Sequence, residues 1–354
     1  MAKGISDSDS GFIMFVCAAA ATAGEDLKKL YTMENRELEK LIEKKEIIGV
    51  DFSGQKLEGV DFSGCRLERV SFKQCELVHC RFRKAIIEWS DFRYARIENG
   101  TFEDARIEFC DFYRAFLDGV IIFNHSNISN CSFNKTYFGD SAMIRRRELV
   151  GGRILQQDAD AYRKFLTEWH MYGTGERKND VGTVSDWSAD EALKTRWDEA
   201  EEIFKNFNAQ WTGKGFIADG NWAYVRGRRM ERRRMMSELF REGIGIKRKL
   251  VNICHIMTNV ASDILFGYGE SMTKMVLTYI VTVFLFAWAF TSNVSLLEYG
   301  EALSVSLKNM AGMDSEVLRD VSPLVDMLNV VQTTIGIVLT GIFGFILGNK
   351  IRNQ

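Results

Sequence analysis

The stretch VDFSGQKLEGVDFSGCRLERVSFKQCEL, residues 50–77, carries a large apolar residue at every fifth position. These residues are Phe52, Leu57, Phe62, Leu67, Phe72 and Leu77. Neither an α-helix nor a β-strand repeats every five residues. A chain that turns a corner at each fifth residue does fit this spacing, because four such sides close one square coil. Repetition of this kind predicts a stack of coils.

The five-residue period continues to residue 122 and then slips by one position. The later members are Phe82, Ile87, Phe92, Ile97, Phe102, Ile107, Phe112, Leu117 and Ile122, and the series resumes at Phe123. A small or modest residue precedes most of them by two positions, and we expect both positions to point inward. The polar residues between them then face solvent. We interpret the slip at Ile122–Phe123 as a bulge.

This pattern resembles the pentapeptide-repeat family, and the resemblance covers residues 49–140. It implies a right-handed quadrilateral β-helix in which Phe stacks on Phe. About four to five coils at a strand spacing of about 4.8 Å would make a rod roughly 20 Å long. A solenoid needs capped ends. The charged segment 25–48 has leucines at helical spacing, which predicts an N-terminal capping helix.

Length and composition set limits on the function. A chain of 354 residues predicts more than one domain, and a net charge of −2 excludes a globally basic nucleic-acid binder. The four histidines are scattered, so we expect neither a metal site nor a cofactor. We recognise no nucleophile, paired-carboxylate or phosphate-loop motif, so we expect no enzymatic activity.

Five of the seven cysteines occupy the small inward position of the repeat. They are Cys65, Cys75, Cys80, Cys110 and Cys131. A free thiol at such a position behaves as a small hydrophobic side chain. The cysteines therefore predict reduced thiols in a cytosolic domain.

The N-terminal segment, residues 1–24, contains the apolar run GFIMFVCAAAATAG. Asp7 and Asp9 precede this run with only Lys3 as a basic residue, which is a poor start for a signal peptide. The run is also too short to cross a membrane. We expect an apolar helix that packs on the β-helix or at a subunit contact.

Two uncharged runs, residues 275–297 and 327–349, are each long enough to cross a bilayer. Basic residues lie in the juxtamembrane segment 251–274, in the residues that immediately precede this segment, and in the tail 350–354. The loop 298–326, in contrast, is acidic. The positive-inside rule then places both termini in the cytoplasm. The sequence predicts a multi-pass membrane protein, and its resemblance to bacterial pentapeptide-repeat membrane proteins implies a bacterial inner membrane.

The loop between the two runs contains EALSVSLKNM, which predicts a short helix, followed by the irregular AGMDSE. This plan resembles the two-span pore-loop ion channels, and the resemblance implies a homotetramer around one pore. The implied pore residues are Asn309, Met310, Ala311, Gly312, Met313, Asp314, Gln332, Thr333, Gly336 and Thr340.

Potassium selectivity does not follow from that resemblance, because residues 309–313 replace the TVGYG of potassium channels. The GYG at residues 267–269 precedes the first span and is not a filter. The acidic loop favours cations at the outer mouth. A simple two-helix membrane anchor is the alternative.

Residues 141–250 are rich in tryptophan, predicted to be helical, and end in a basic run. This region, with GYGE at residues 267–270, resembles bacterial pentapeptide-repeat membrane proteins. Around a fourfold axis the arginines would form a positive ring suited to a polyanion. They are Arg226, Arg228, Arg229, Arg232, Arg233 and Arg234. Lys247, Arg248 and Lys249 fit attraction to anionic lipids.

Two tryptophans of this region, Trp211 and Trp222, allow two interpretations. Exposed beside the arginines they could stack nucleic-acid bases. Otherwise they pack a helical hairpin.

The whole plan is a mixed fold: a β-helix, an α-helical linker domain and a two-helix transmembrane pore-loop module. It resembles the channel effectors of bacterial anti-phage defence, in particular Hailong-type membrane effectors. That resemblance implies membrane depolarisation, gated by a single-stranded DNA oligomer or a cyclic or linear nucleotide from a partner nucleotidyltransferase. The alternatives are an ordinary cation channel with another stimulus and a non-conducting membrane-anchored scaffold.

Overall fold

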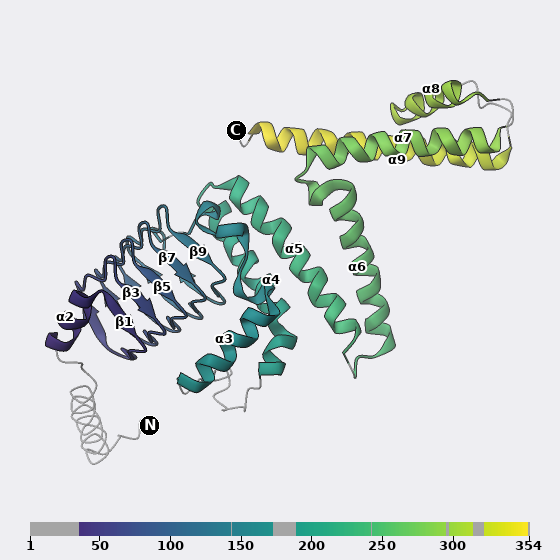
Figure 1. Cartoon of the computed structure of the whole chain (residues 1–354). Coiled ribbons are helices and arrows are strands. Elements are labelled where there is room, and N and C mark those ends of the chain that lie inside the picture. The colour runs from purple at the N-terminus through teal and green to yellow at the C-terminus, as the bar shows by residue number, and fades with distance from the viewer. Residues whose placement is uncertain are drawn as a thin grey trace, which may run out of the picture. The chain divides into compact units, whose positions relative to one another are not determined.

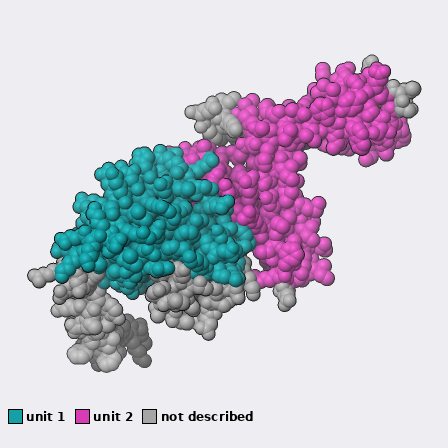
Figure 2. Space-filling view, in the orientation of Figure 1, with its two compact units in different colours: residues 1–203 teal, residues 204–354 magenta. Residues whose placement is uncertain are grey.

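The computed structural model describes residues 35–142, 144–172, 189–241, 243–294, 297–313 and 322–352. The chain divides into two compact units, residues 1–203 and residues 204–354 (Figure 2). Each unit is described by itself below. The predicted apolar segment 1–24 lies outside the described residues.

The five-residue period of unit 1 builds ten short strands in two parallel sheets (Figure 1). One sheet contains β1 (Glu46–Ile48), β3 (Arg66–Glu68), β5 (Ile86–Glu88), β7 (Arg106–Glu108) and β9 (Asn127–Ser129). The other contains β2 (Lys56–Glu58), β4 (Glu76–Val78), β6 (Arg96–Glu98), β8 (Phe116–Asp118) and β10 (Tyr137–Phe138). Isolated bridges, including Asp51 to Ser71 and Asp61 to Arg81, join the two remaining sides of successive coils. The predicted four-sided solenoid of parallel strands is confirmed.

Stacked phenylalanine rings fill the centre of this solenoid. The Phe82 ring lies 5.0 Å from that of Phe62 in one neighbouring coil and 4.8 Å from that of Phe102 in the other. Phe72 and Phe92 form a second stack, and the rings of the two stacks meet edge to face. All five side chains are fully buried. Offset and edge-to-face ring contacts add to the free energy that burial alone provides.

The solenoid cysteines are free and buried, as the repeat predicted. The Cys75 thiol donates a hydrogen bond to the carbonyl of Phe52, and the Cys80 thiol donates one to the carbonyl of Leu57. Burial raises the pKa of Cys75 to about 12 and that of Cys80 to about 11. Because the thiolate is the reactive form, these thiols are poor nucleophiles.

The extra residue in the repeat lies earlier than predicted. Ile121 and Phe123 are buried, whereas Val120 is 56% exposed and Ile122 is 36% exposed. The insertion therefore occupies the corner at Gly119–Val120 rather than Ile122–Phe123. Asn99 of the preceding coil supports it, because its side-chain oxygen accepts a hydrogen bond from the Val120 N–H at 2.9 Å.

Helices flank both ends of the solenoid. Before it, α2 (Asn35–Lys44) contacts β1 and agrees with the predicted cap, although β1 already pairs with β3 and so starts the solenoid before residue 49. After β10 come η1 (Arg146–Glu148), η2 (Val150–Gly152), η3 (Leu155–Gln157) and α3 (Ala159–Tyr172). The Phe165 ring of α3 lies 6.5 Å from that of Trp89, which stacks on Phe109.

Unit 2 is helical. Its elements are the end of α4 (Ala189–Gly213), then α5 (Ile217–Leu239), α6 (Ile246–Phe266), η4 (Gly267–Gly269), α7 (Met272–Asn293), α8 (Tyr299–Met310) and α9 (Pro323–Arg352). Three stretches are long and apolar enough to cross a membrane: Ile246–Gly269, Met272–Asn293 and Pro323–Gly348. The sequence predicted the last two as spans and assigned the first to the linker and juxtamembrane segments. These apolar helices indicate membrane association.

The phenylalanine stack yields the first prediction. Replacing Phe82 by Ala leaves a cavity between Phe62 and Phe102, so we expect the free energy of unfolding to fall by about 3–5 kcal/mol. Arg83→Ala is the matched control, since Arg83 is exposed and its ion pair with Glu103 has limited value in solvent. Pulse proteolysis across a urea series measures both. Equal protease resistance of the two variants would contradict the stacked core.

Candidate functional site

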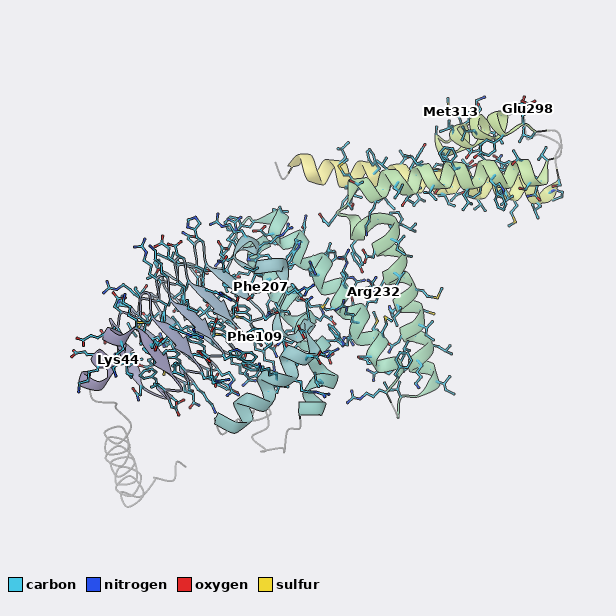
Figure 3. All side chains as sticks on the ribbon, viewed as in Figure 1. Lys44, Phe109, Phe207, Arg232, Glu298 and Met313 are labelled. Carbon is cyan, nitrogen blue, oxygen red and sulfur yellow. The ribbon has the colours of Figure 1, made fainter. Side chains whose placement is uncertain are left out.

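Helix α8 packs against both α7 and α9 (Figure 1). Figure 3 labels Glu298 and Met313, which flank its two ends. The α8 residues Ala302 and Val305 are buried in one apolar cluster with Phe286 and Phe290 of α7. The short helix predicted from residues 301–310 is present and starts two residues earlier, at Tyr299.

Buried hydrogen bonds fix α8 to its neighbours. The Ser306 hydroxyl donates to the carbonyl of Val283 in α7 at 2.8 Å. The Gln332 amide of α9 donates to the carbonyl of Ser306 at 3.2 Å and accepts from the Asn309 amide at 3.0 Å. Ser306, Asn309 and Gln332 are at most 1% exposed. These polar groups satisfy one another in apolar surroundings, where an unpaired one would be costly.

The direction of α8 follows from these contacts. Helix α8 begins after the C-terminal end of α7, and Ser306 bonds to Val283, which lies near the middle of α7. The short helix therefore runs back along α7 and ends about halfway along it. A helix with 22 residues is about 33 Å long. If α7 crosses a bilayer, the carbonyl end of α8 lies at middle depth.

The chain makes a tight turn at the C-terminal end of α8. Gly312 adopts a φ of +72°, which a glycine accommodates without strain, and its N–H donates to the carbonyl of Asn309. The free carbonyl groups give this end a partial negative charge. Lys308 is exposed in the last turn of the helix and opposes that charge.

Among the glycines of α9, Gly336 lies closest to α8. A Cβ atom added there would lie 2.6 Å from both the Cα and the carbonyl oxygen of Met310. Backbone atoms cannot move aside as a flexible side-chain end can. By contrast, nothing lies within 4 Å of a Cβ added at Gly341 on the same helix.

The structure separates the predicted pore residues into three groups. Asn309, Met310, Gln332 and Gly336 are buried between α8 and its neighbours within the chain. Ala311, Gly312, Met313 and Thr340 are exposed, and Thr333 is half-buried with its hydroxyl bonded to the Asn329 carbonyl. Asp314 lies outside the described residues.

A second polar cluster joins α5, α6 and the start of α7. The Asp263 carboxylate of α6 accepts hydrogen bonds from Arg229 at 3.0 and 3.1 Å and from Arg232 at 3.2 Å. The Lys274 ammonium of α7 lies 3.0 Å from the same carboxylate. Figure 3 labels Arg232, on the side of α5 that faces α6. One carboxylate therefore ties three helices together.

Two asparagines extend this polar contact along α6. The Asn252 amide donates to the Glu238 carboxylate of α5 at 3.0 Å, and the Asn259 amide donates to the Arg228 carbonyl at 3.1 Å. Asn252, Asn259 and Asp263 are all at least nine-tenths buried. The face of α6 that packs on α5 is therefore polar, and its polar groups are paired.

The GYG at residues 267–269 forms the turn between α6 and α7. Gly267, Tyr268 and Gly269 all have positive φ angles. The Tyr268 hydroxyl donates to the Asn259 side chain at 2.7 Å, and Glu270 accepts a hydrogen bond from Asn221 of α5 at 2.8 Å. The motif is therefore a helix junction, in agreement with its exclusion as a filter.

Most of the predicted ligand-binding arginines are engaged within the chain. Arg229 and Arg232 hold Asp263, Arg228 pairs with Glu231, and Arg234 pairs with Glu238. The Arg226 guanidinium lies 5.2 Å from the centre of the Trp222 ring, and Arg233 is exposed. A polyanion would have to compete with these carboxylates for the same side chains.

The two tryptophans pack the hairpin of α4 and α5. Trp211 is fully buried and stacks on Phe207 at 5.0 Å, and the Trp222 ring lies 6.2 Å from that of Trp211. The packing interpretation of Trp211 is therefore correct. Trp222 is half-buried under Arg226.

Sequence reasoning missed the residues that hold both clusters. Asp263 is the only acidic residue of α6. Asn252 and Asn259 share its face because the spacings of four, seven and eleven residues follow the helical period. That pattern was visible in the sequence. Ser306 carried no such signal, because one serine in a short helix is ordinary.

Residues 45–122 match the family model described as "Pentapeptide repeat region". The chain therefore contains a pentapeptide-repeat domain. In the structure this domain is a four-sided β-helix. A comparison with curated proteins found no match.

Solved structures of pentapeptide repeat proteins are similar to part of this chain. Rfr23 from the cyanobacterium Cyanothece 51142 is 13% identical, with a TM-score of 0.18, over 30% of this chain and 91% of its own. HetL from Nostoc sp. strain PCC 7120, described as involved in heterocyst differentiation regulation, is 14% identical, with a TM-score of 0.20, over 30% and 47%. A thylakoid-lumen protein of Arabidopsis thaliana is 25% identical, with a TM-score of 0.14, over 25% and 71%. At these TM-scores the likenesses add nothing to the family match.

The close approach at Gly336 yields the second prediction. Gly336→Ala should lower the melting temperature of the detergent-solubilised protein, because overpacking against the Met310 backbone costs about 1–3 kcal/mol. Gly300→Ala in α8 should leave it unchanged or raise it slightly, since nothing lies within 4 Å of a Cβ added there and alanine favours a helix. Differential scanning fluorimetry compares the two variants. Identical melting temperatures would show that α8 does not pack on α9 at Gly336.

The Asp263 cluster yields the third prediction. Asp263→Asn preserves the side-chain shape but leaves Arg229, Arg232 and Lys274 without their carboxylate, so unfolding should become easier by about 1–3 kcal/mol. Glu231→Gln removes a partner from a more exposed pair and should change stability by no more than about 0.5 kcal/mol. Urea unfolding in detergent measures both. An Asp263→Asn protein as stable as the parent would refute the role of this carboxylate.

Proposed function

We propose that the chain assembles as a homotetramer in a bacterial inner membrane, with both termini in the cytoplasm, and conducts ions. The observation that carries this proposal is the short helix α8, which is hydrogen-bonded to α7 and α9 and ends about halfway along α7. A simple two-helix anchor has no need for a buried polar network that holds a third helix at that depth. A pore needs such a rigid element near its narrowest point.

The outer faces of α7 and α9 suit lipid and neighbouring subunits. Large apolar side chains are exposed on both helices, among them Trp288 at 66%, Ile337 at 61% and Phe345 at 70%. Opposite the face that packs on α8, helix α9 exposes Thr334, Gly341, Gly344 and Gly348 on one stripe. Small and hydroxyl residues allow close helix approach in membranes. We assign this stripe, rather than Gln332 and Gly336, to the subunit contacts and the pore lining.

The charges near the end of α8 favour a weakly selective pore. The carbonyl end of the helix attracts cations, whereas the exposed Lys308 repels them. The acidic loop adds negative charge at the outer mouth. With these opposing contributions and no TVGYG segment, we expect cations and anions to differ little in permeability.

The Asp263 cluster supplies a candidate gating contact. An anionic ligand that binds Arg229 and Arg232 must displace Asp263, which also holds Lys274 at the start of α7. Ligand binding would therefore change the contacts of a membrane helix. A ligand shifts such an equilibrium only by its difference in affinity for the two states.

A narrower proposal concerns the biological role. The resemblance seen in the sequence supports an anti-phage defence effector that depolarises the membrane and responds to a single-stranded DNA oligomer or a nucleotide made by a partner nucleotidyltransferase. An ordinary channel with another stimulus and a non-conducting scaffold remain the competing functions. In every case we propose a role without catalysis.

Ion flux from reconstituted vesicles provides the fourth prediction. The parent protein should release trapped K⁺, and a single-stranded oligonucleotide should change the rate of release. Replacing Arg229 and Arg232 by Gln should abolish this response, whereas Lys247→Gln with Lys249→Gln should retain it. The affinity of the parent protein should fall with salt, with a log–log slope of about −0.7 for each phosphate that its basic side chains neutralise.

The outcomes separate the competing functions. No flux with or without oligonucleotide, from protein shown to be inserted, would leave the scaffold. Flux that no oligonucleotide alters would leave a channel with another stimulus. An oligonucleotide response that survives in the arginine variant would remove Arg229 and Arg232 from the ligand site.

A further inference from the structure

We propose that α6, although long and apolar enough to cross a bilayer, lies in the plane of the cytoplasmic membrane surface and binds anionic lipids. Its exposed apolar face would sit at the boundary between headgroups and acyl chains. The proposal rests on the membrane insertion of α7 proposed above, but it does not depend on ion conduction.

The exposed face of α6 is a continuous apolar stripe. Its residues recur at spacings of four and three, as one face of a helix requires. They are Ile246, Leu250, Ile253, Met257 and Ile264, which are exposed, and Val260, which is half-buried. Met257 is 68% exposed and Ile264 is 65% exposed, so nothing among the described residues covers this face. Such a stripe demands an apolar partner.

The opposite face of α6 explains why the helix does not cross. Asn252, Asn259 and Asp263 bind α5 at three points along the helix. Helix α5 carries six arginines between residues 226 and 234, so a spanning α6 would carry many charged side chains of α5 into the hydrocarbon region. Charged residues in that region are rare and need a polar partner or a water-filled cavity. An in-plane α6 keeps α5 on the aqueous side.

Basic side chains identify the lipid that fits. Lys247 and Lys249 flank the apolar stripe on its two sides at the N-terminal end of α6, and Lys247 is exposed. Long cationic side chains in this position bury their apolar stems and direct the ammonium groups to the headgroups. Anionic headgroups attract them.

The other end of α6 lies beside the start of α7. The turn at residues 267–269 separates the two helices, Lys274 reaches back to Asp263, and the Thr278 hydroxyl donates to the Leu265 carbonyl at 2.7 Å. The stripe is therefore continuous with the surface at which α7 enters the bilayer. This continuity favours lipid over a second copy of the chain as the partner of the stripe.

Spin labels measure the depth of α6 in the intact protein. Cysteines are introduced singly as Leu250→Cys, Met257→Cys and Ile264→Cys in a protein with Cys17→Ser and Cys254→Ser. The five solenoid cysteines are buried, and burial raises the pKa of Cys75 and of Cys80. The three positions are exposed, so the labels leave the contacts with α5 in place. Leu277→Cys and Phe284→Cys on α7 are membrane controls, and Arg233→Cys on α5 is the aqueous control.

The labelled protein is reconstituted in vesicles of phosphatidylethanolamine and phosphatidylglycerol, and collision with oxygen and with a nickel chelate gives each depth. We expect the three α6 labels to lie at one shallow depth, about 5–10 Å below the headgroups. The two α7 labels should differ in depth by about 10 Å, since seven residues separate them. The Arg233→Cys label should collide freely with the chelate.

Three results would overturn the proposal. Depths that change by about 1.5 Å per residue from Leu250 to Ile264 would show a spanning helix. Labels shielded from both reagents would show a contact with a second copy, and labels open to the chelate alone would show a solvent-exposed helix. If the two α7 labels fail to enter the bilayer, the proposed membrane function fails instead, and the two failures are distinguishable.

Discussion

Asp263 places a carboxylate on a helix that is otherwise apolar enough to enter a membrane, and a buried carboxylate requires positive partners. Arg229 and Arg232 from α5 and Lys274 from α7 provide them. That one requirement decides which face of α6 turns toward α5 and which face remains apolar and exposed. It also couples the start of α7 to the packing of α5, because Lys274 lies in the first turn of α7.

The same rule organises the packing of α7, α8 and α9 on a smaller scale. Ser306, Asn309 and Gln332 are polar side chains in apolar surroundings, and each finds its partners in the other two or in the backbone. Their mutual bonds determine where α8 lies along α7 and α9. Gly336 completes the arrangement, because only a residue without a Cβ permits the backbone of Met310 to approach so closely. Gln332 and Gly336, which the sequence predicted as pore residues, are packed against α8 within the chain.

The β-helix contributes a rigid element whose outer surface offers little chemistry. Glu68, Glu88 and Glu108 stack in register on the outer side of one sheet, and three arginines form ion pairs with them: Arg66, Arg69 and Arg106. The described acidic column is thus balanced within the solenoid. The proposed sensing function therefore rests on the helices that follow, where an anionic ligand would compete with carboxylates for the same arginines.

How much the sequence alone could predict differs between the two units. The solenoid is predictable because each of its coils repeats the same local pattern, so Phe82 must stack on Phe62 and Phe102 once the period is known. Even there, the extra residue falls at Val120 rather than Ile122, because the side chain of Asn99 decides which corner can hold it. The apolar spans and the short α8 are also predictable, since length and hydropathy are local properties of the chain.

The polar contacts between helices are not local, and here the tertiary structure decided. In the sequence, Gln332, Gly336 and the arginines of α5 look available to line a pore or bind a ligand. In the structure, α8 packs against Gln332 and Gly336. Asp263, which is 34 residues from Arg229 in the sequence, accepts a hydrogen bond from it. Composition and period tell which side chains need a partner. Which partner they find depends on helix packing, because a hydrogen bond or ion pair forms only between groups that the fold places within about 3 Å of one another.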